Sequence, residues 1–550
     1  MAYQKNETIE LEITGLGSEG EGIGRTDAFL WFVKDAVPGD VVRASVMKTK
    51  KNYGYARLQE VLIPSPDRQE TECPAAKSCG GCTLQALRYP AQLRYKEQRV
   101  RDSLTRIGGI DLAPVNFHKI LGMDYPFRYR NKTQYPVGPG KFGEPVAGFY
   151  AGRTHSIVPC GDCLLGPEEN GAILETVLQW MRDFGIPAYD EREKSGLVRH
   201  VMIRKGFATG EIMTCVVTNG ESAGGTLEDL SERLMKVPGI ATVVQNVNEA
   251  DTNVILGSET RVLAGSGYIT DYIGSIVYKI SAESFYQVNP VQTLKLYETV
   301  RNCAALTGKE TVWDLYCGIG TISLFLAKDA GKIYGAEIEP RAVEDARWNA
   351  EKNDIRNAQY FAGKAEEILP AFYEKSGEKA DVIIVDPPRK GCDQKCLSTI
   401  LKMAPSRVIY VSCDPSTLAR DLKFLLSDGA YRLTEVQPVD MFPQTAHIET
   451  VVLLSKGEVD SKKIRVEFSL EDMDMSEFQD GATYTQIKDY VLEHSGLKVS
   501  NLYISQIKRK CGIEVGKNYN LPKSEDSRQP LCPPEKEKAI REAFKYFGII

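Results

Sequence analysis

The residues best suited to chemistry are a cysteine and a glutamate that stand at the ends of two strand-like runs. Cys413 directly follows the β-branched and aromatic run 408–412, and an Asp-Pro pair then ends the strand pattern. Glu449 opens a second such run, 449–456. A thiol and a carboxylate at neighbouring strand ends can act as nucleophile and general base. Each residue alone is more often structural, because packing thiols and surface acids are common.

A glycine turn and two further acids indicate a nucleotide-type ligand in the same cleft. The run 312–316 predicts a strand that enters the turn CGIG, where Gly318 lets the backbone approach a ligand closely. Glu337 ends the next strand about twenty residues later, a position from which an acid binds ribose hydroxyls. The turn is neither a dinucleotide GxGxxG motif nor a P-loop, which favours S-adenosylmethionine (AdoMet). Asp386 lies at a third strand end and is expected to face this cleft, although a turn-forming Asp-Pro is the alternative.

These groups together suit methylation of a uracil ring at carbon 5. That carbon is a poor nucleophile until a thiolate adds to carbon 6, after which the resulting enolate can attack a methyl donor. Cys413 is the expected nucleophile, Glu449 the base that removes the carbon 5 proton, and Asp386 the group that holds the uracil edge. The target base must be single-stranded or flipped to reach the cleft.

The chain resembles the RNA (uracil-5-)-methyltransferase family, which includes TrmA-type tRNA enzymes and RumA-type 23S rRNA enzymes. The matching motifs, in order, are SFYQVNP at 284–290, DLYCGIGTISL at 314–324, AEIEP at 336–340, DPPRKG at 386–391, SCDP at 412–415 and HIET at 447–450. The resemblance implies an AdoMet site lined by Gln287, Tyr316, Glu337 and Asp386, with Cys413 as nucleophile and Glu449 as base. The family often has Asn where this chain has Asp414, and we expect that difference to be tolerated.

A second group of chemistry-bearing residues is a compact set of cysteines. Cys73, Cys79 and Cys82, with two glycines among them, can wrap a metal or a cluster, and Cys160 and Cys163 are candidates for a fourth ligand. The spacing alone leaves a zinc site, a redox pair at Cys79 and Cys82, or unligated thiols open. The ribosomal branch of the family has a [4Fe-4S] cluster here, which implies Cys73, Cys79, Cys82 and Cys163 as its ligands. We expect a structural or RNA-positioning role for it.

The elements that must position these residues predict an α/β protein of four segments. Residues 1–64 show short strands and Gly-rich turns, typical of a small OB-like barrel, and resemble the RNA-binding TRAM domain. Residues 65–279 predict an α/β middle domain that carries the iron-sulfur loop, with strands near 197–206 and 211–220. Residues 280–456 alternate strands with helices, which predicts a doubly wound sheet. This is the Rossmann-like class I AdoMet methyltransferase domain that the resemblance implies.

The last segment, residues 457–550, lies outside the family pattern. It begins with an acidic stretch and continues with two predicted amphipathic helices joined around Ser495-Gly496. A helix-turn-helix-like nucleic-acid module and a small helical packing domain both fit this pattern.

Composition sets the broad class of the protein. The net charge of −6 argues only weakly against a nucleic-acid partner, because binding depends on where positive charge lies. Local basic clusters are Arg43, Lys48, Lys50, Lys51 and Arg57; Arg128, Arg130 and Lys132; and Lys508, Arg509 and Lys510. The 13 cysteines are unlikely to form disulfides in a chain that we expect to be cytoplasmic and without a membrane segment. Charge balance does not determine an oligomeric state.

The sequence therefore predicts a 23S rRNA (uracil-5-)-methyltransferase that uses AdoMet. The barrel and the cysteine cluster favour ribosomal RNA as the partner, because plain TrmA-type tRNA enzymes lack both. Three alternatives stay open: a tRNA uracil-5-methyltransferase, a cytosine-5 RNA methyltransferase, and an iron-sulfur RNA-binding or assembly factor without turnover. The acid in HIET fits uracil chemistry better than cytosine chemistry, and intact Cys413 and Glu449 weigh against a factor without turnover.

Overall fold

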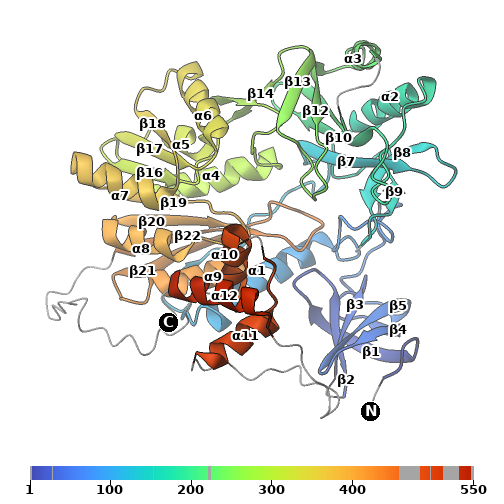
Figure 1. The fold of residues 1–550 in the computed structure, drawn as a ribbon, viewed down its shortest axis with the longest axis horizontal. Helices are drawn as coiled ribbons and strands as arrows, with labels where there is room; N and C mark the ends of the chain where they lie inside the picture. The colour runs from blue at the N-terminus through green and yellow to red at the C-terminus, as the bar shows by residue number, and fades with distance from the viewer. Residues whose placement is uncertain are drawn as a thin grey trace. The chain divides into compact units, whose positions relative to one another are not determined.

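The computed structural model describes residues 3–27, 29–152, 154–220, 225–456, 484–495, 497–511 and 532–546. The chain divides into two compact units, residues 1–459 and residues 460–550 (Figure 1). No helix within these described ranges is long and apolar enough to cross a membrane.

The first unit begins with a closed barrel of strand order β1-β2-β3-β5-β4. Its strands are β1 (Thr8–Leu16), β2 (Gly22–Thr26), β3 (Phe29–Lys34), β4 (Val41–Thr49) and β5 (Tyr53–Ile63). Alternate residues of β1 point inward and pack around the fully buried Trp31. Gly54 is required beside this indole, since a Cβ there would lie 2.3 Å from the Trp31 ring.

A seven-stranded sheet of order β13-β12-β11-β10-β7-β8-β9 forms the middle of this unit. Its strands are β7 (Lys132–Pro139), β8 (Pro145–Tyr150), β9 (Ile157–Pro159), β10 (Val198–Lys205), β11 (Ile212–Thr218), β12 (Ile240–Val247) and β13 (Glu259–Ala264). Helices α2 (Asn170–Asp183) and α3 (Leu227–Leu234) pack on it through one core that includes Trp180 and Leu230. The strands predicted near 197–206 and 211–220 are confirmed as β10 and β11. A hairpin, β14 (Ile269–Ile273) and β15 (Ile276–Ile280), follows.

An eight-stranded sheet of order β18-β17-β16-β19-β20-β22-β21-β6 carries the predicted catalytic residues. Its strands are β6 (Asn116–Phe117), β16 (Thr311–Leu315), β17 (Lys332–Glu337), β18 (Ala358–Ala362), β19 (Val382–Val385), β20 (Arg407–Ser412), β21 (Tyr431–Val439) and β22 (Glu449–Lys456). Strands β16 to β20 are parallel, and β22 is antiparallel to both of its neighbours. The strand order reverses between β16 and β19, and such a switch point is where open α/β sheets bind ligands.

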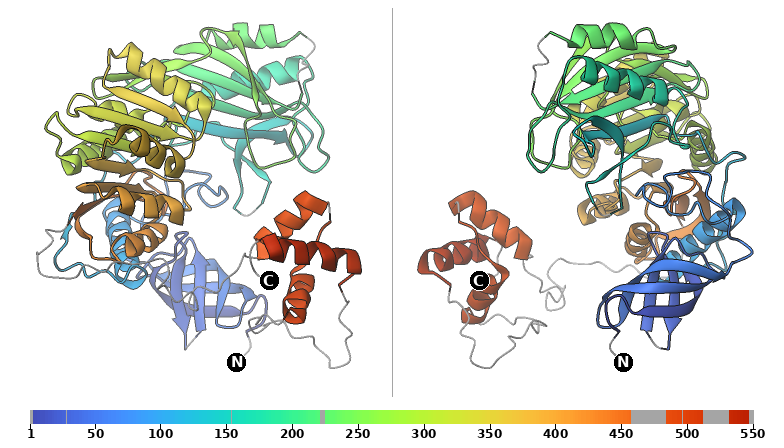
Figure 2. Two further views of the ribbon diagram at one scale, coloured as in Figure 1. Left: turned by 60° about the vertical axis from the view of Figure 1, so that its left-hand side comes forward. Right: turned by 90° about the vertical axis from the view of Figure 1, so that its right-hand side faces the viewer.

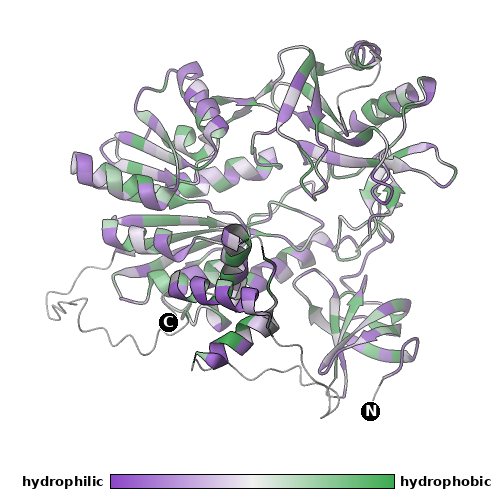
Figure 3. Ribbon diagram, viewed as in Figure 1, coloured by the Kyte–Doolittle hydropathy of each residue, from purple (hydrophilic) through white to green (hydrophobic). Residues whose placement is uncertain are grey.

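Helices enclose this sheet on both faces (Figure 2). They are α4 (Pro290–Ala304), α5 (Thr321–Leu326), α6 (Pro340–Lys352), α7 (Ala365–Ser376), α8 (Gln394–Met403) and α9 (Pro415–Leu425). Successive strand residues enter different cores: Val312 packs on one face of the sheet, and Trp313 packs on the other. Burial on both faces explains why a strand such as β20 is hydrophobic over most of its length (Figure 3).

Part of the predicted middle segment joins the catalytic sheet instead of the middle sheet. Strand β6 pairs with β21, and helix α1 (Tyr89–Arg106) packs against α9. Lys96 of α1 is fully buried, with its Nζ 2.5 Å from Asp440 Oδ1 and 3.0 Å from the Phe442 carbonyl oxygen. A charged group buried in this way needs its partner, and the pair therefore holds α1 to the loop that follows β21.

We expect Lys96→Met to lower the free energy of unfolding by about 3–5 kcal/mol, because it leaves the Asp440 carboxylate buried without its cation. Urea unfolding followed by circular dichroism measures this change. The double variant Lys96→Met/Asp440→Leu should recover a large part of the loss, since it removes both charges. A single variant within 1 kcal/mol of the parent would contradict a stabilising role for the pair.

The second unit contains α10 (Tyr484–Ser495), α11 (Asn501–Lys510) and α12 (Pro534–Tyr546). Ile487, Ile504, Ile540 and Phe544 are fully buried in a core of their own. The acidic stretch and Gly496, which the sequence prediction included, lie outside the described residues.

Candidate functional site

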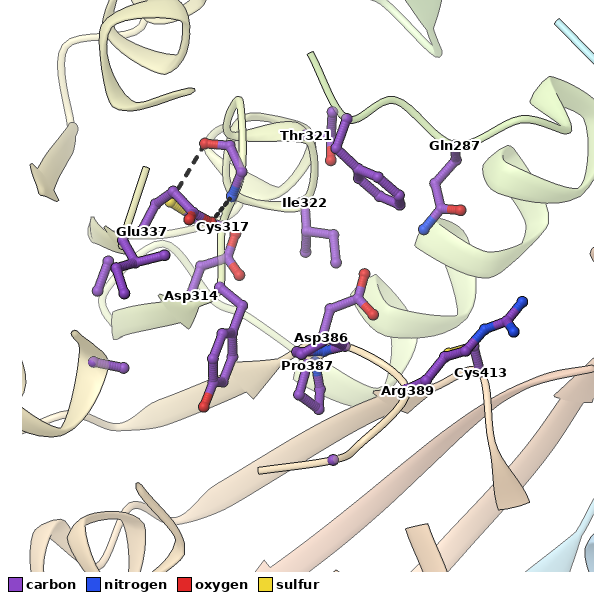
Figure 4. Close-up of a pocket in the computed structure, with 18 of the residues that line it drawn as sticks. Gln287, Asp314, Cys317, Thr321, Ile322, Glu337, Asp386, Pro387, Arg389 and Cys413 are labelled. Carbon is purple, nitrogen blue, oxygen red and sulfur yellow. Dashed lines mark hydrogen bonds between the residues drawn. The ribbon is translucent and has the colours of Figure 1, made fainter. Parts of the chain in front are cut away.

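A cavity of about 870 Å³ opens at the carboxyl ends of the central strands. It is lined by every residue predicted to bind cofactor or to act in catalysis: Gln287, Tyr316, Gly318, Glu337, Asp386, Cys413 and Glu449. Figure 4 shows Glu337 at one end of this cavity and Asp386, Arg389 and Cys413 together at the other. The cavity therefore separates a nucleoside-type end from an end that carries reactive groups.

The glycine turn after β16 shapes the first end. Tyr316 and Gly318 adopt left-handed backbone conformations, with φ of 68° and 56°. The turn brings the Gly318 N–H to 3.0 Å from Glu337 Oε2 (Figure 4). The Glu339 N–H lies 3.0 Å from Glu337 Oε1. Two backbone donors thus fix the Glu337 carboxylate, whose remaining lone pairs can accept from two ribose hydroxyls.

Asp314, which the sequence reasoning did not select, lies beneath this turn. Its Oδ2 accepts from the Ser323 backbone N–H at 3.1 Å and from the Ser323 hydroxyl. Its Oδ1 is buried and, among the described residues, has no hydrogen-bond partner. Burial raises the pKa of this carboxyl to about 7. An acceptor of this kind on the cavity wall is suited to a donor group of the cofactor, and its signal in the sequence was the Asp of VWDLYCG.

The second end places the predicted nucleophile opposite the predicted base. Ser412 pairs with Thr450 across β20 and β22, so Cys413 and Glu449 occupy adjacent ends of antiparallel neighbours. Asp386 follows β19, the strand on the other side of β20. The structure therefore brings together three groups that are separated by up to 63 positions, and Glu449 is only 4% exposed.

The electrostatics of this end disfavour negative charge before a ligand arrives. Burial raises the pKa of Glu449 well above its usual value, and the nearby Asp386 carboxyl adds to the shift. Burial likewise raises the pKa of Asp386 to about 7. Burial also raises the pKa of the Cys413 thiol to about 12, and the nearby Glu449 and Asp386 carboxyls add to that shift. The Arg389 guanidinium offsets part of the shift at Cys413 and Glu449.

The residue after the nucleophile has a local structural role. Asp414 is the N-cap of α9, and its Oδ1 accepts from the backbone N–H groups of Ser416 at 2.8 Å and Thr417 at 3.0 Å. Asp and Asn cap helices about equally well. This equivalence supplies a physical reason for the expected tolerance of either residue at position 414.

The predicted metal cysteines converge in the first unit. Burial raises the pKa of Cys82 to about 12, with further contributions from Cys163, Cys79 and Cys73, and Cys163 shifts upward for similar reasons. Cys82 and Cys163 also pack against one small core around Tyr129. Over the described part of the chain, however, no three His, Cys, Asp or Glu side chains form a group that could hold a metal ion. The donor set thus has the thiol chemistry that a cluster needs, but the iron-sulfur prediction is not confirmed.

The sequence reasoning did not assign four further cavity residues to the site, although two of them lie inside quoted motifs and one in a named basic cluster. These are Arg130, Phe285, Phe442 and His447. Phe442 and His447 come from the loop that the Lys96–Asp440 pair anchors, so only the tertiary contacts reveal how they are placed.

Two protein-family descriptions match this chain. Residues 258–457 match the family tRNA (uracil-5-)-methyltransferase, and residues 3–58 match the TRAM domain. An uncharacterized RNA methyltransferase from Halalkalibacterium halodurans is 49% identical over 82% of this chain and 97% of its own length. The chain belongs to the RNA (uracil-5-)-methyltransferase family. The predicted family, and with it the class I methyltransferase fold behind a TRAM domain, is confirmed.

Two further similar proteins extend the comparison. An uncharacterized RNA methyltransferase from Bacillus cereus is 48% identical over 83% of this chain and 98% of its own length. The crystal structure of Pyrococcus abyssi tRNA (uracil-54, C5)-methyltransferase in complex with S-adenosyl-L-homocysteine matches with a TM-score of 0.65 and 26% identity. That match covers 81% of this chain and 100% of the other.

Proposed function

We propose that this uracil-5-methyltransferase forms 5-methyluridine in 23S rRNA by way of a covalent adduct between Cys413 and uracil carbon 6. The observation that carries the proposal is the placement of Cys413 and Glu449 at adjacent strand ends, beside Asp386 and in the same cavity as Glu337. The barrel and the cysteine loop are the reason for preferring ribosomal RNA.

AdoMet, when bound, supplies the methyl group. Cys413 gives up its thiol proton to solvent and adds its sulfur to carbon 6, and the electron pair of the 5,6 double bond moves toward the carbonyl at carbon 4. Asp386 hydrogen-bonds the uracil edge, so that carbon 5 faces the methyl donor. Glu449 takes the carbon 5 proton after the methyl group has been transferred, and Cys413 then leaves as the double bond re-forms. The uracil ring is therefore neutral again at the end of the cycle.

The raised pKa values of this site predict that cofactor binding releases protons. Burial raises the pKa of Asp386 to about 7, with a further contribution from Asp314, and burial together with the Asp386 carboxyl raises the pKa of Glu449 well above its usual value. A sulfonium cation beside them lowers both pKa values, so the carboxyls ionise and about one proton leaves. AdoMet affinity should therefore rise with pH between about pH 6 and 8.

Titration calorimetry at pH 7 in two buffers of different ionisation enthalpy measures the protons released per AdoMet bound. Asp386→Asn should reduce that number, because it removes one of the titrating groups. Net proton uptake by the parent protein would contradict the proposed charge balance.

Nucleoside mass spectrometry tests the proposed function directly. Unmodified 23S transcript and unmodified tRNA are each incubated with the protein and isotopically labelled AdoMet, then digested to nucleosides. Label in 5-methyluridine from the 23S transcript alone supports the proposal. Label in 5-methylcytidine, or no label with fully cofactor-loaded protein, would overturn it.

Methylation of tRNA is the second candidate function. The matched Pyrococcus abyssi protein is a tRNA enzyme, and its whole chain aligns with 81% of this one. That coverage weakens the inference from the barrel and the cysteines to ribosomal RNA. Label in tRNA alone would select this candidate.

We also propose that Cys73, Cys79, Cys82 and Cys163 hold a [4Fe-4S] cluster. Cys163 is preferred to Cys160 because it shares a small core with Cys82. Cluster chemistry here is structural, since methyl transfer needs no electrons. Iron and acid-labile sulfide in anaerobically purified protein should reach about four each per chain, and Cys163→Ser should lower both more than Cys160→Ser does.

A further inference from the structure

Two cations stand near the start of β7, where Arg130 lines the cavity and Lys132 is two residues further along the chain. Arg128, Arg130 and Lys132 form one run in the sequence, but the structure separates their roles. Arg128 binds both carboxylate oxygens of Asp162, at 2.5 and 2.8 Å. Arg130 lines the cavity, and its Nε donates to the Lys132 carbonyl at 3.4 Å. Within the ranges that the structure describes, neither Arg130 nor Lys132 forms an ion pair.

A third cation concentrates positive charge at this place. Arg204 pairs with Lys132 in the β7–β10 register, and its guanidinium is buried, donating to the carbonyl oxygens of Ala282 at 3.1 Å and Ser284 at 2.5 Å. Burial lowers the pKa of Lys132 to about 7, and Arg204 and Arg130 add to that shift. Glu283 is in electrostatic range of Arg204 and also accepts a hydrogen bond from Thr260.

The position of these cations relates them to the reaction site. Asn131, between Arg130 and Lys132, donates its backbone N–H to the Val288 carbonyl and its side-chain amide to the Gln287 carbonyl, both at 2.8 Å. The start of β7 is thereby joined to the loop that supplies Phe285 and Gln287 to the cavity. Phe285 is 64% exposed, so this side of the rim is open to solvent.

Crowded cations without carboxylates cost free energy unless an anion joins them. The acids of the cavity lie at its deep end, away from these cations, so they do not serve as the anion that the cations need. A uridine that enters the cavity must bring its own phosphodiester groups to the rim, because a flipped base stays attached to its backbone. Phosphate oxygens are the common partners of Arg and Lys in nucleic-acid complexes.

We propose that Arg130 and Lys132 bind a phosphodiester next to the target uridine and so hold that nucleotide at the mouth of the cavity. This inference rests on the proposed RNA methyltransferase function. It assigns a backbone contact, which fixes the register of the RNA but reads no sequence.

The test measures binding of a fluorescently labelled, uridine-containing single-stranded RNA at several KCl concentrations. Lys132→Met and Arg130→Gln should each raise the Kd about tenfold at low salt and reduce the slope of log K against log [KCl] by about 0.7, the value for one phosphate on a single strand. Lys132→Arg should restore most of the affinity. In methylation assays with the RNA substrate, the variants should raise KM for that RNA much more than they lower kcat.

Lys309→Met is the matched control, because it removes the same charge from an exposed position just before β16, at the opposite end of that strand from the cavity. Its salt slope should equal that of the parent. Unchanged slopes for both Lys132→Met and Arg130→Gln would overturn the proposal. A higher Kd for AdoMet in the two variants, with unchanged RNA binding, would also overturn the proposal. That result would assign the cations to the carboxylate of AdoMet.

The wild-type protein separates this inference from the proposed function. If it forms no 5-methyluridine but the two variants still show a smaller salt slope for RNA binding, the proposed reaction is wrong and the proposed phosphate contact stands. If it forms 5-methyluridine and the slopes do not change, only the phosphate contact is wrong.

Discussion

Cys413→Ala is expected to lower turnover by on the order of 10⁴-fold or more, because the ring cannot be activated without sulfur at carbon 6. The side chain stands at the end of β20, opposite Glu449, and lines the same cavity as the predicted cofactor residues. AdoMet binding should be nearly unchanged, since the nucleoside end is formed by the turn after β16 and by Glu337. Loss of turnover with retained cofactor affinity separates a chemical role from a folding role.

RNA that carries 5-fluorouridine gives the same variant a second test. Fluorine cannot leave carbon 5 as a proton does, so the wild-type protein should stop at a covalent protein–RNA complex that survives denaturing electrophoresis. Cys413→Ala should form none. Cys303→Ala, at a half-buried thiol of α4 outside the cavity, should behave like the parent. Substantial turnover by Cys413→Ala would rule out the covalent mechanism.

Glu449→Gln is expected to slow turnover by about 10²- to 10⁴-fold, the range for a lost general base. Its effect should differ in kind from that of Cys413→Ala. The amide cannot take the carbon 5 proton, so methylated RNA should remain attached to Cys413. Burial at 4% exposure and the adjoining Asp386 leave little room for water to replace the carboxylate.

A denaturing gel with labelled AdoMet measures this outcome on ordinary uridine RNA. The label should appear in a protein–RNA band with Glu449→Gln and in free RNA with the parent. Glu344→Gln, an exposed acid of α6, is the matched control and should release methylated RNA normally. Free methylated RNA at the parent rate from Glu449→Gln would show that another group removes the proton.

The sequence by itself determined the family and the strand ends at which the predicted catalytic residues lie. Strand periodicity and glycine turns are local properties, so the runs before Cys413 and Gly318 could be recognised without knowledge of distant residues. The acid at Glu337 was found in the same way, from its spacing after the turn. Asp386 reaches the cavity because parallel strands bring their carboxyl ends to one edge, and Glu449 reaches it because β22 begins at that edge, antiparallel to β20.

Only the tertiary structure decided which charges are paired and which segments pack together. Lys96 and Asp440 are 344 positions apart, and no local pattern predicts that one neutralises the other. Arg128, Arg130 and Lys132 look alike in the sequence, but Asp162 reaches only the first of them. Helix α1 and strand β6 join the catalytic sheet because burial of that ion pair and pairing with β21 hold them there. Such contacts depend on which distant segments of the chain lie side by side in the fold. The residue order within a short segment does not give that information.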